Sequence, residues 1–133
     1  MIGSRHGNLR GVSGEGGSCL YRAVAYQLCE QSSRPYEDAR EVTDLRTRVQ
    51  TYLRDHANDT VPGSDPLKWG DIGPYVGGHA EAPIPQAMAY VIGRPLTVHW
   101  QKKMHEYGRA LPGKAIHVGL VGDHYIIKYH VQP

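Results

Sequence analysis

Residues 14–28, GEGGSCLYRAVAYQL, contain the point at which the chain passes from a glycine-rich loop into a helical pattern. Apolar side chains recur at every third or fourth residue after Cys19, which predicts a helix that begins there. The helix is expected to end near residues 31–33, before a proline at position 35. Ser18 is suited to be the N-cap, so Cys19 becomes the first helical residue.

A cysteine in the first turn of a helix lies in an environment suited to thiol chemistry. The helix N-terminus carries partial positive charge and N–H groups without a helical partner, and it stabilises a thiolate. The same N–H groups hold a developing oxyanion, and neighbouring glycines let a substrate chain approach closely. These features indicate nucleophilic acyl transfer by Cys19, although a cysteine at a helix start also packs well as a small buried hydrophobic residue.

A second feature, VGDHY at residues 121–125, places a histidine at the start of a strand. Gly122-Asp123 has the composition of a two-residue hairpin turn, and the pattern from His124 to Val131 predicts the returning strand. A cysteine with a distant histidine is the general arrangement of a thiol peptidase. Because the chain has eight histidines, the position directly after a turn is what singles out His124.

The other segments predict an α+β domain. In chain order the expected elements are a short strand around residues 9–12, a helix at 36–56, a loop at 57–82, a helix at 83–92 and strands at 95–100 and 115–121. Residues 101–114 are expected to be a loop, with Gln101-Lys102-Lys103 as a solvated turn. Helices come first and strands last, which favours a small, mostly antiparallel sheet packed between helices, in one domain at residues 1–133.

The composition argues against several classes of function. The net charge of +2 is spread along the chain without a Lys/Arg block, so we expect no nucleic-acid partner. No stretch approaches the ~20 apolar residues of a membrane span, so we expect no membrane partner. A metal site could be imagined at His117 and His124 together with His99, His130 or Cys19. The spacing of these residues is not typical of metal ligands, so we expect no metal and no cofactor.

The two cysteines, Cys19 and Cys29, are expected to be free thiols. On one helix their Cα atoms would lie about 15 Å apart, at about 1.5 Å per residue. A disulfide requires Cα atoms within about 7 Å of each other. Free thiols suit a reducing compartment, and we expect the protein to act in the cytoplasm.

Residues 14–28 resemble the cysteine block of the ovarian tumour (OTU) superfamily of cysteine proteases, in which Gly-Asp-Gly-x-Cys-Leu-Phe-Arg-Ala leads into a helix. Residues 76–81 (VGGHAE) are similar to the family's Trp-Gly-Gly-x-x-Glu element, with valine in place of tryptophan. Residues 86–98 are similar to its Ala-Leu-Ala helix and following strand. Residues 116–125 (IHVGLVGDHY) are similar to the block that holds the catalytic histidine. The resemblance spans residues 14–129 in the right order and implies a papain-like OTU fold.

The resemblance also implies roles for individual residues. Cys19 corresponds to the nucleophile that attacks the carbonyl at the ubiquitin C-terminus. His124 corresponds to the base that takes the thiol proton and later protonates the leaving lysine amine. Backbone N–H groups of Gly16, Gly17 and Cys19 correspond to the oxyanion hole.

The third catalytic residue departs from the family's pattern. Many members place Asp or Asn two residues after the histidine, where this chain has Ile126. Asp123 is adjacent to His124, and adjacent strand residues point to opposite faces. Asn8 is the first alternative, by similarity to relatives whose third residue precedes the cysteine, and Glu15 is the second. A dyad without a third member is equally consistent with the sequence.

The resulting hypothesis is a deubiquitinase: an isopeptidase that removes ubiquitin or a ubiquitin-like modifier from lysine through a thioester intermediate. Two alternatives stay open, a peptidase that processes its own polyprotein and a catalytically dead module that binds ubiquitin. Compact versions of this family occur in viral polyproteins and bacterial effectors. We therefore expect a monomer with ubiquitin as partner, acting in the cytoplasm of a host cell.

Overall fold

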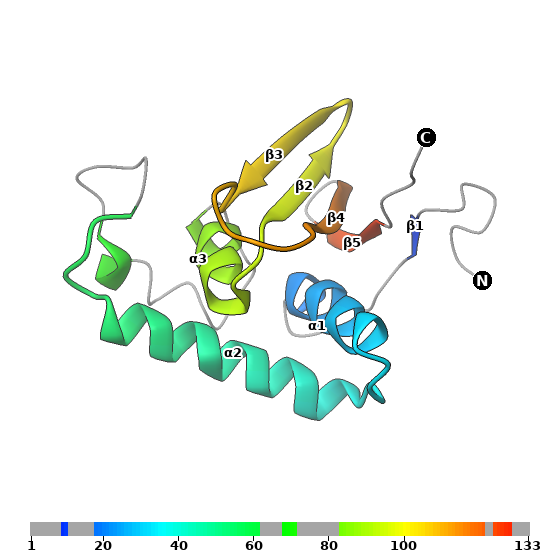
Figure 1. Cartoon of the computed structure of the whole chain (residues 1–133), viewed down its shortest axis with the longest axis horizontal. Coiled ribbons are helices and arrows are strands. Elements are labelled where there is room, and N and C mark those ends of the chain that lie inside the picture. Colours follow the sequence, from blue (N-terminus) through cyan, green and yellow to red (C-terminus); the bar gives the residue numbers. More distant parts are fainter. Residues whose placement is uncertain (1–8, 11–17, 62–67, 72–82, 122–123, 129–133) are drawn as a thin grey trace.

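The computed structural model describes residues 9–10, 18–61, 68–71, 83–121 and 124–128. The elements in this part of the chain are β1 (Leu9–Arg10), α1 (Cys19–Gln31), α2 (Asp38–Asp55), the 3-10 turn η3 (Trp69–Asp71), α3 (Pro83–Ile92), β2 (Leu96–Trp100), β3 (Lys103–Tyr107), β4 (Ile116–Val121) and β5 (His124–Lys128). The helices precede most of the sheet in the chain and pack together against it (Figure 1), which confirms the α+β class.

The first helix follows the prediction closely. It begins at Cys19 and ends at Gln31, because the chain turns at Ser33, which has a positive φ of 52°. The second helix begins at Asp38, two residues later than expected. The reason is that the Glu37 side chain accepts a hydrogen bond from Arg40 N–H at 2.9 Å and so acts as the N-cap.

The third helix ends where its glycine predicts. Gly93 has a φ of +70°, a conformation that glycine adopts without steric cost. The N–H groups of Gly93 and Arg94 both donate to the Ala89 carbonyl, at 2.9 and 3.2 Å. This cap turns the chain from α3 into β2.

The sheet has the strand order β1-β5-β4-β2-β3. Three of its four pairings are antiparallel, and only β2 and β4 run parallel. This confirms the mostly antiparallel sheet. β4 occupies its centre and β5 lies between β1 and β4, so the strand that begins with His124 has a neighbour on each side.

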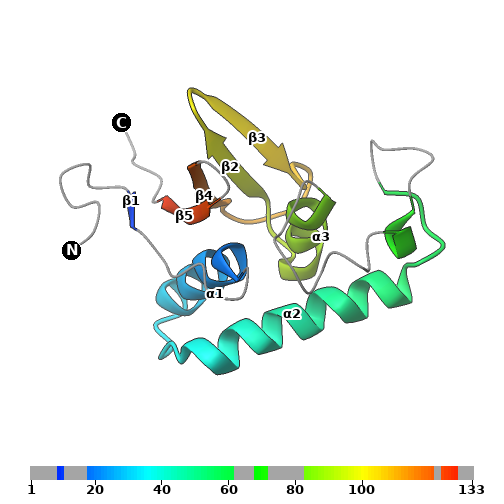
Figure 2. The same cartoon turned by 180° about the vertical axis from the view of Figure 1, so that it is seen from behind.

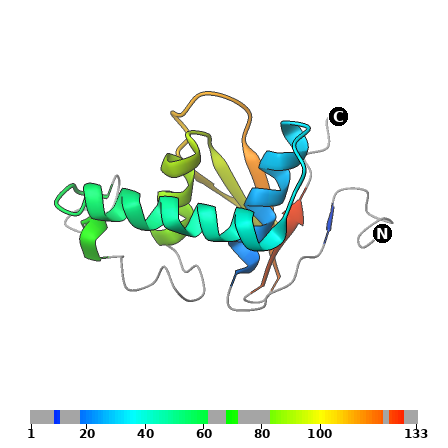
Figure 3. The ribbon, with the colours of Figure 1, turned by 90° about the horizontal axis from the view of Figure 1, so that it is seen from below.

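The core lies on one face of the sheet. The inward side chains of β2, β4 and β5 are buried there with those of α1 and α3: Leu96, Val98, Ile116, Val118, Tyr125 and Ile127 from the strands. Helix α2 packs behind α1 and α3 and crosses both of them, as Figure 3 shows.

The sequence analysis led us to expect a sheet packed between helices. In the described residues the helices lie on a single face, as the view from behind also shows (Figure 2).

Strand β3 corrects the sequence analysis. Residues 103–107 were expected to be part of a loop, and Lys103 part of a turn, but they pair with β2 at the edge of the sheet. Four of the five residues of β3 are exposed, so the segment lacks the alternation that identifies a half-buried strand. The turn is tighter than expected, with Gln101 at a positive φ of 55°.

An aromatic cluster anchors residues 68–71. Trp69 is buried, and its ring lies 5.4 Å from Tyr52 of α2 and 5.9 Å from Tyr90 of α3. These contacts hold the end of the predicted loop against α2 and α3. The predicted turn at residues 122–123 falls outside the described residues. Among the helices that are described, none is long and apolar enough to cross a membrane.

Candidate active site

Cys19 lies at the first position of α1, packed into the core, with 2 % of its surface exposed. Ser18 occupies the N-cap position as predicted, but its side chain makes no capping hydrogen bond. Its hydroxyl instead accepts a hydrogen bond of 2.8 Å from Nη2 of Arg46 on α2. The expectation of a side-chain cap at Ser18 was therefore wrong, because a tertiary donor takes the hydroxyl oxygen.

Arg46 also contacts Tyr21 in the first turn of α1. Its guanidinium carbon lies 4.5 Å from the centre of the Tyr21 ring, an arrangement that favours a cation–π interaction. Burial raises the pKa of Tyr21 to about 12, so the ring stays neutral at ordinary pH. The sequence analysis missed Arg46, because nothing in the charged face of α2 distinguishes it from solvated neighbours. Its two contacts hold the start of α1 against α2.

The sulfur of Cys19 contacts the strand that follows His124. The backbone N–H of Tyr125 donates to Cys19 Sγ at 3.3 Å, across 106 positions in sequence. Consecutive Cα atoms are about 3.8 Å apart, so the backbone of His124 lies directly beside this contact. Because the N–H groups of a strand point sideways within the sheet, the sulfur lies along the edge of β5, next to both faces of the strand. An N–H directed at the sulfur complements the negative charge that a thiolate carries, together with the positive end of the helix. The structure thus brings together the two segments that the sequence singled out.

His124 opens β5 on the face of the sheet that points away from the helices. Tyr125 and Ile127 are buried against the core, while His124, Ile126 and Lys128 alternate with them and are partly exposed. Burial is also the main cause that raises the pKa of Tyr125 to about 12. The neutral Tyr125 side chain therefore anchors β5 in the core and fixes the position of His124.

A buried glutamine joins α1 to the sheet. Gln27 is only 2 % exposed, and its Nε2 donates to the His117 carbonyl at 2.8 Å and to the Ala23 carbonyl at 3.1 Å. Together with the Tyr125 contact to Cys19, this gives α1 two polar links to neighbouring strands. No role was predicted for Gln27 from the sequence. A polar residue on the apolar face of a helix is the signal that could have identified it.

Cys29 lies in a different environment from Cys19. It is buried near the end of α1, and burial, with a hydrogen bond to Glu41, raises the pKa of its thiol. Glu41 also accepts hydrogen bonds from Arg34 at 2.9 Å and from Arg40 at 3.2 Å. Cys29 is thus part of a structural polar cluster. Neither described cysteine forms a disulfide.

Several predicted residues fall outside the part of the chain that the structure describes: Asn8, Glu15, Gly16, Gly17 and Asp123. The described neighbour of Asn8 is Leu9, which pairs with Lys128 at the opposite end of β5 from His124. Among the described residues, no group of three or more metal-ligating side chains gathers at one place. His99 and His117 instead share a hydrogen bond of 2.8 Å between Nε2 and Nδ1.

Comparison with known protein families gives a match over most of the chain. Residues 15–125 match the family described as OTU-like cysteine protease. A search of curated protein sequences finds no match.

Three solved structures share the fold. An OTU domain in complex with ubiquitin has a TM-score of 0.64 and 18% identity, over 95% of this chain and 73% of that one. The viral OTU domain protease from Dera Ghazi Khan virus has a TM-score of 0.65 and 12% identity, over 96% and 84%. The OTUD1 OTU domain has a TM-score of 0.62 and 18% identity, over 92% and 85%.

Proposed function

This chain belongs to the family of OTU-like cysteine proteases, and from that premise we propose that it is an isopeptidase acting on ubiquitin or a ubiquitin-like modifier. Such an enzyme cleaves the bond between the modifier's C-terminal carbonyl and a lysine amine. One structural neighbour is an OTU domain in complex with ubiquitin, and its likeness in fold supports the choice of substrate.

The contact between Tyr125 N–H and Cys19 Sγ at 3.3 Å carries the proposal. It places the residue after His124 against the sulfur that would attack, at the positive end of α1. A nucleophile at a helix N-terminus beside a histidine is the arrangement that activated thiols use. No other described cysteine has it, because Cys29 is paired with Glu41.

In the proposed reaction, His124 takes the proton of the Cys19 thiol, and the thiolate attacks the carbonyl carbon of the isopeptide bond. The backbone N–H of Cys19, with those of Gly16 and Gly17, holds the negative charge on the carbonyl oxygen. The C–N bond then breaks, and His124 gives its proton to the leaving lysine amine. Water attacks the thioester, His124 takes a proton from that water, and the carboxylate leaves as the thiol is restored.

The proposal uses a dyad of Cys19 and His124. Ile126 lies two residues after His124 and is apolar, so it cannot orient an imidazole through a hydrogen bond. Asn8 stays the sequence prediction for a third residue. Its described neighbour Leu9 pairs at the far end of β5, which makes the dyad the simpler assignment.

The environment proposed for the enzyme is the cytoplasm of a host cell. Both cysteines are free, as suits a reducing compartment. One of the structural neighbours is a viral protease, which supports a pathogen setting. We further propose that the domain acts as a monomer.

The test is incubation with ubiquitin that carries an electrophile at its C-terminus, beside Cys19→Ala and His124→Ala variants of checked fold. We expect an adduct of one ubiquitin per protein, absent with Cys19→Ala and much slower with His124→Ala. A folded wild-type protein that forms no adduct with ubiquitin or any ubiquitin-like modifier would contradict the proposed substrate. An adduct that persists in Cys19→Ala would contradict the assigned nucleophile.

A further inference from the structure

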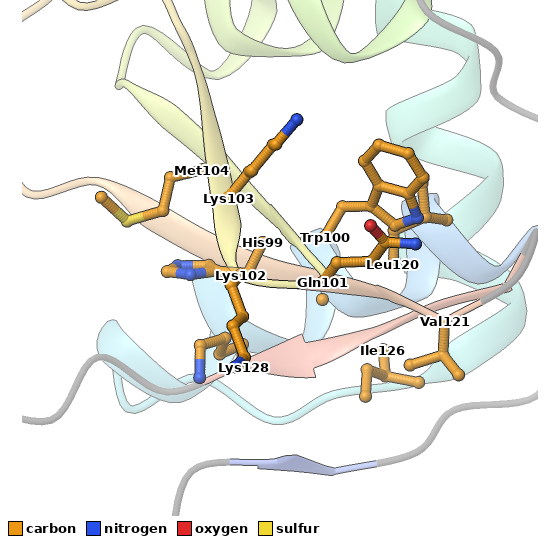
Figure 4. A pocket seen from close by; sticks show the side chains of 11 residues that line it. His99, Trp100, Gln101, Lys102, Lys103, Met104, Leu120, Val121, Ile126 and Lys128 are labelled. Carbon is orange, nitrogen blue, oxygen red and sulfur yellow. The ribbon is translucent and has the colours of Figure 1, made fainter.

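The face of the sheet that points away from the helices has a hollow at its centre. Its floor is Gly119, which pairs with His99 on one side and Ile126 on the other. A Cβ added at Gly119 would lie 3.2 Å from Cγ1 of Ile126, so the missing side chain is what leaves the space. Met104 and Val121 border the hollow and are 60% and 64% exposed. Its volume is about 690 Å³ (Figure 4).

Lysines lie along one edge of this hollow. Lys102 and Lys128 border it, and Figure 4 shows their side chains on the same side of the strands as Val121 and Ile126. The side chain of Lys103 extends the opposite way, as expected from strand alternation. Trp100 and Lys103 also line the hollow, which therefore combines an apolar centre with positive charge at its edge. This surface complements a chain segment that carries an apolar side chain next to carboxylates.

The hollow lies next to the proposed catalytic base. Val121 pairs directly with His124 across the β4–β5 ladder, and Ile126 lies two residues further along β5. Residues two apart on a strand share a face and are about 6.8 Å apart. His124 therefore lies on the same face of the sheet as the hollow, directly opposite Val121 and two residues from Ile126.

This position decides which part of a substrate reaches the hollow. The leaving amine takes its proton from the base, so the polypeptide that carries the amine must pass on the side of His124. The hollow begins on that side, on the face of the sheet that no described helix covers. Trp100 and His99 also line the hollow, and nucleic acid binds by stacking its bases on aromatic side chains. A single-stranded oligonucleotide is therefore the competing occupant that the binding experiment must test.

We infer that this hollow binds the polypeptide on the leaving side of the scissile bond and selects an acidic segment with an apolar anchor. The inference rests on the proposed isopeptidase function for its reaction. It does not depend on which modifier supplies the acyl group. It makes Lys102, Lys128 and the Gly119 hollow the determinants of which modified proteins are processed.

The first experiment measures binding of two fluorescent peptides to the Cys19→Ala protein. One peptide has a leucine flanked by glutamates, and the other has glutamines in their place. We expect about fivefold tighter binding of the acidic peptide at low salt, falling as salt screens the charges. Lys102→Glu/Lys128→Glu should abolish this preference, and Lys102→Glu alone should reduce it if the double variant does not fold. Lys68→Glu/Lys114→Glu, at two exposed lysines outside the hollow and with the same change in net charge, should keep it.

Equal affinity for the two peptides, or equal loss of the preference in both double variants, would overturn the inference. So would a single-stranded oligonucleotide that displaces the acidic peptide while binding more tightly.

The second experiment assigns the hollow to the leaving side. Ubiquitin is joined through its C-terminus to a lysine of either peptide, and each rate is divided by the same enzyme's rate on ubiquitin with a small fluorescent leaving group. We expect about fivefold higher kcat/KM for the acidic leaving peptide. Equal normalised rates would overturn the leaving-side assignment. If the small fluorescent substrate is not cleaved, the proposed substrate fails, while the binding experiment still decides whether the hollow selects acidic segments.

Discussion

Replacing Gln27 by leucine tests whether one buried side chain joins the nucleophile helix to the sheet. The Nε2 group of Gln27 donates to the His117 carbonyl at 2.8 Å and to the Ala23 carbonyl at 3.1 Å. Leucine has a similar size, so the substitution removes the hydrogen bonds with little change in packed volume. The expected effect is therefore that of lost polar contacts rather than of a cavity.

The structure sets the size of the effect. The Gln27 side chain is 2 % exposed, so water cannot replace it as the donor to His117. A hydrogen bond contributes about 0.5–1.5 kcal/mol net, and a buried acceptor that loses its partner costs about 1–3 kcal/mol. We expect Gln27→Leu to lower the free energy of unfolding by about 1–3 kcal/mol. Gln27→Ala should lower it by about 2–5 kcal/mol more, because it also leaves a cavity.

Urea unfolding measures this change. The midpoint should fall while the slope stays that of the wild type, since the surface exposed on unfolding is unchanged. Gln50→Leu is the matched control, because Gln50 is exposed on α2 and should change the free energy by no more than about 0.5 kcal/mol. A Gln27→Leu protein as stable as the Gln50→Leu control would refute the assigned role.

Two further predictions follow from the polar groups of α1 and α2. Iodoacetamide should label Cys19 faster than Cys29 in the folded protein, because burial and Glu41 raise the pKa of the Cys29 thiol; equal labelling by mass spectrometry would contradict this. The hydrogen bond from Arg34 lowers the pKa of Glu41 in the folded protein. The ionised Glu41 therefore stabilises the fold above the ordinary carboxyl pKa of about 4.3, and this stabilisation is lost as the pH falls through the lowered pKa of the folded protein. Unfolding midpoints measured from neutral to acidic pH should therefore fall less steeply in Glu41→Gln than in the wild type, and identical pH profiles would argue against the linkage.

The sequence predicted the helices well, for local reasons. A glycine-rich loop followed by apolar residues at helical spacing gave the start of α1 at Cys19, and Gly93 gave the end of α3. These features depend on neighbours within a few residues, which is the range over which propensity and capping act. Strand β3 was missed because its residues are exposed at the edge of the sheet, where no apolar alternation is required.

The tertiary contacts of the site were beyond the reach of the sequence. The chemistry of Ser18 fits a helix cap, but its hydroxyl is used by Arg46, whose position depends on how α2 packs against α1. The partner of Gln27 is a carbonyl 90 positions away, on a strand whose register is set by the whole sheet. Propensity and spacing contain no information about such distant partners.

The sequence by itself determined the two segments that are proposed to carry the chemistry, one at Cys19 and one at His124. Only the tertiary structure decided that they meet, because the hydrogen bond between Tyr125 N–H and Cys19 Sγ depends on the packing of α1 against β5. The tertiary structure also decided which face of the sheet stays open beside His124. Strand alternation assigns residues to two faces, but only the packing of α1 and α3 determines which face becomes the core.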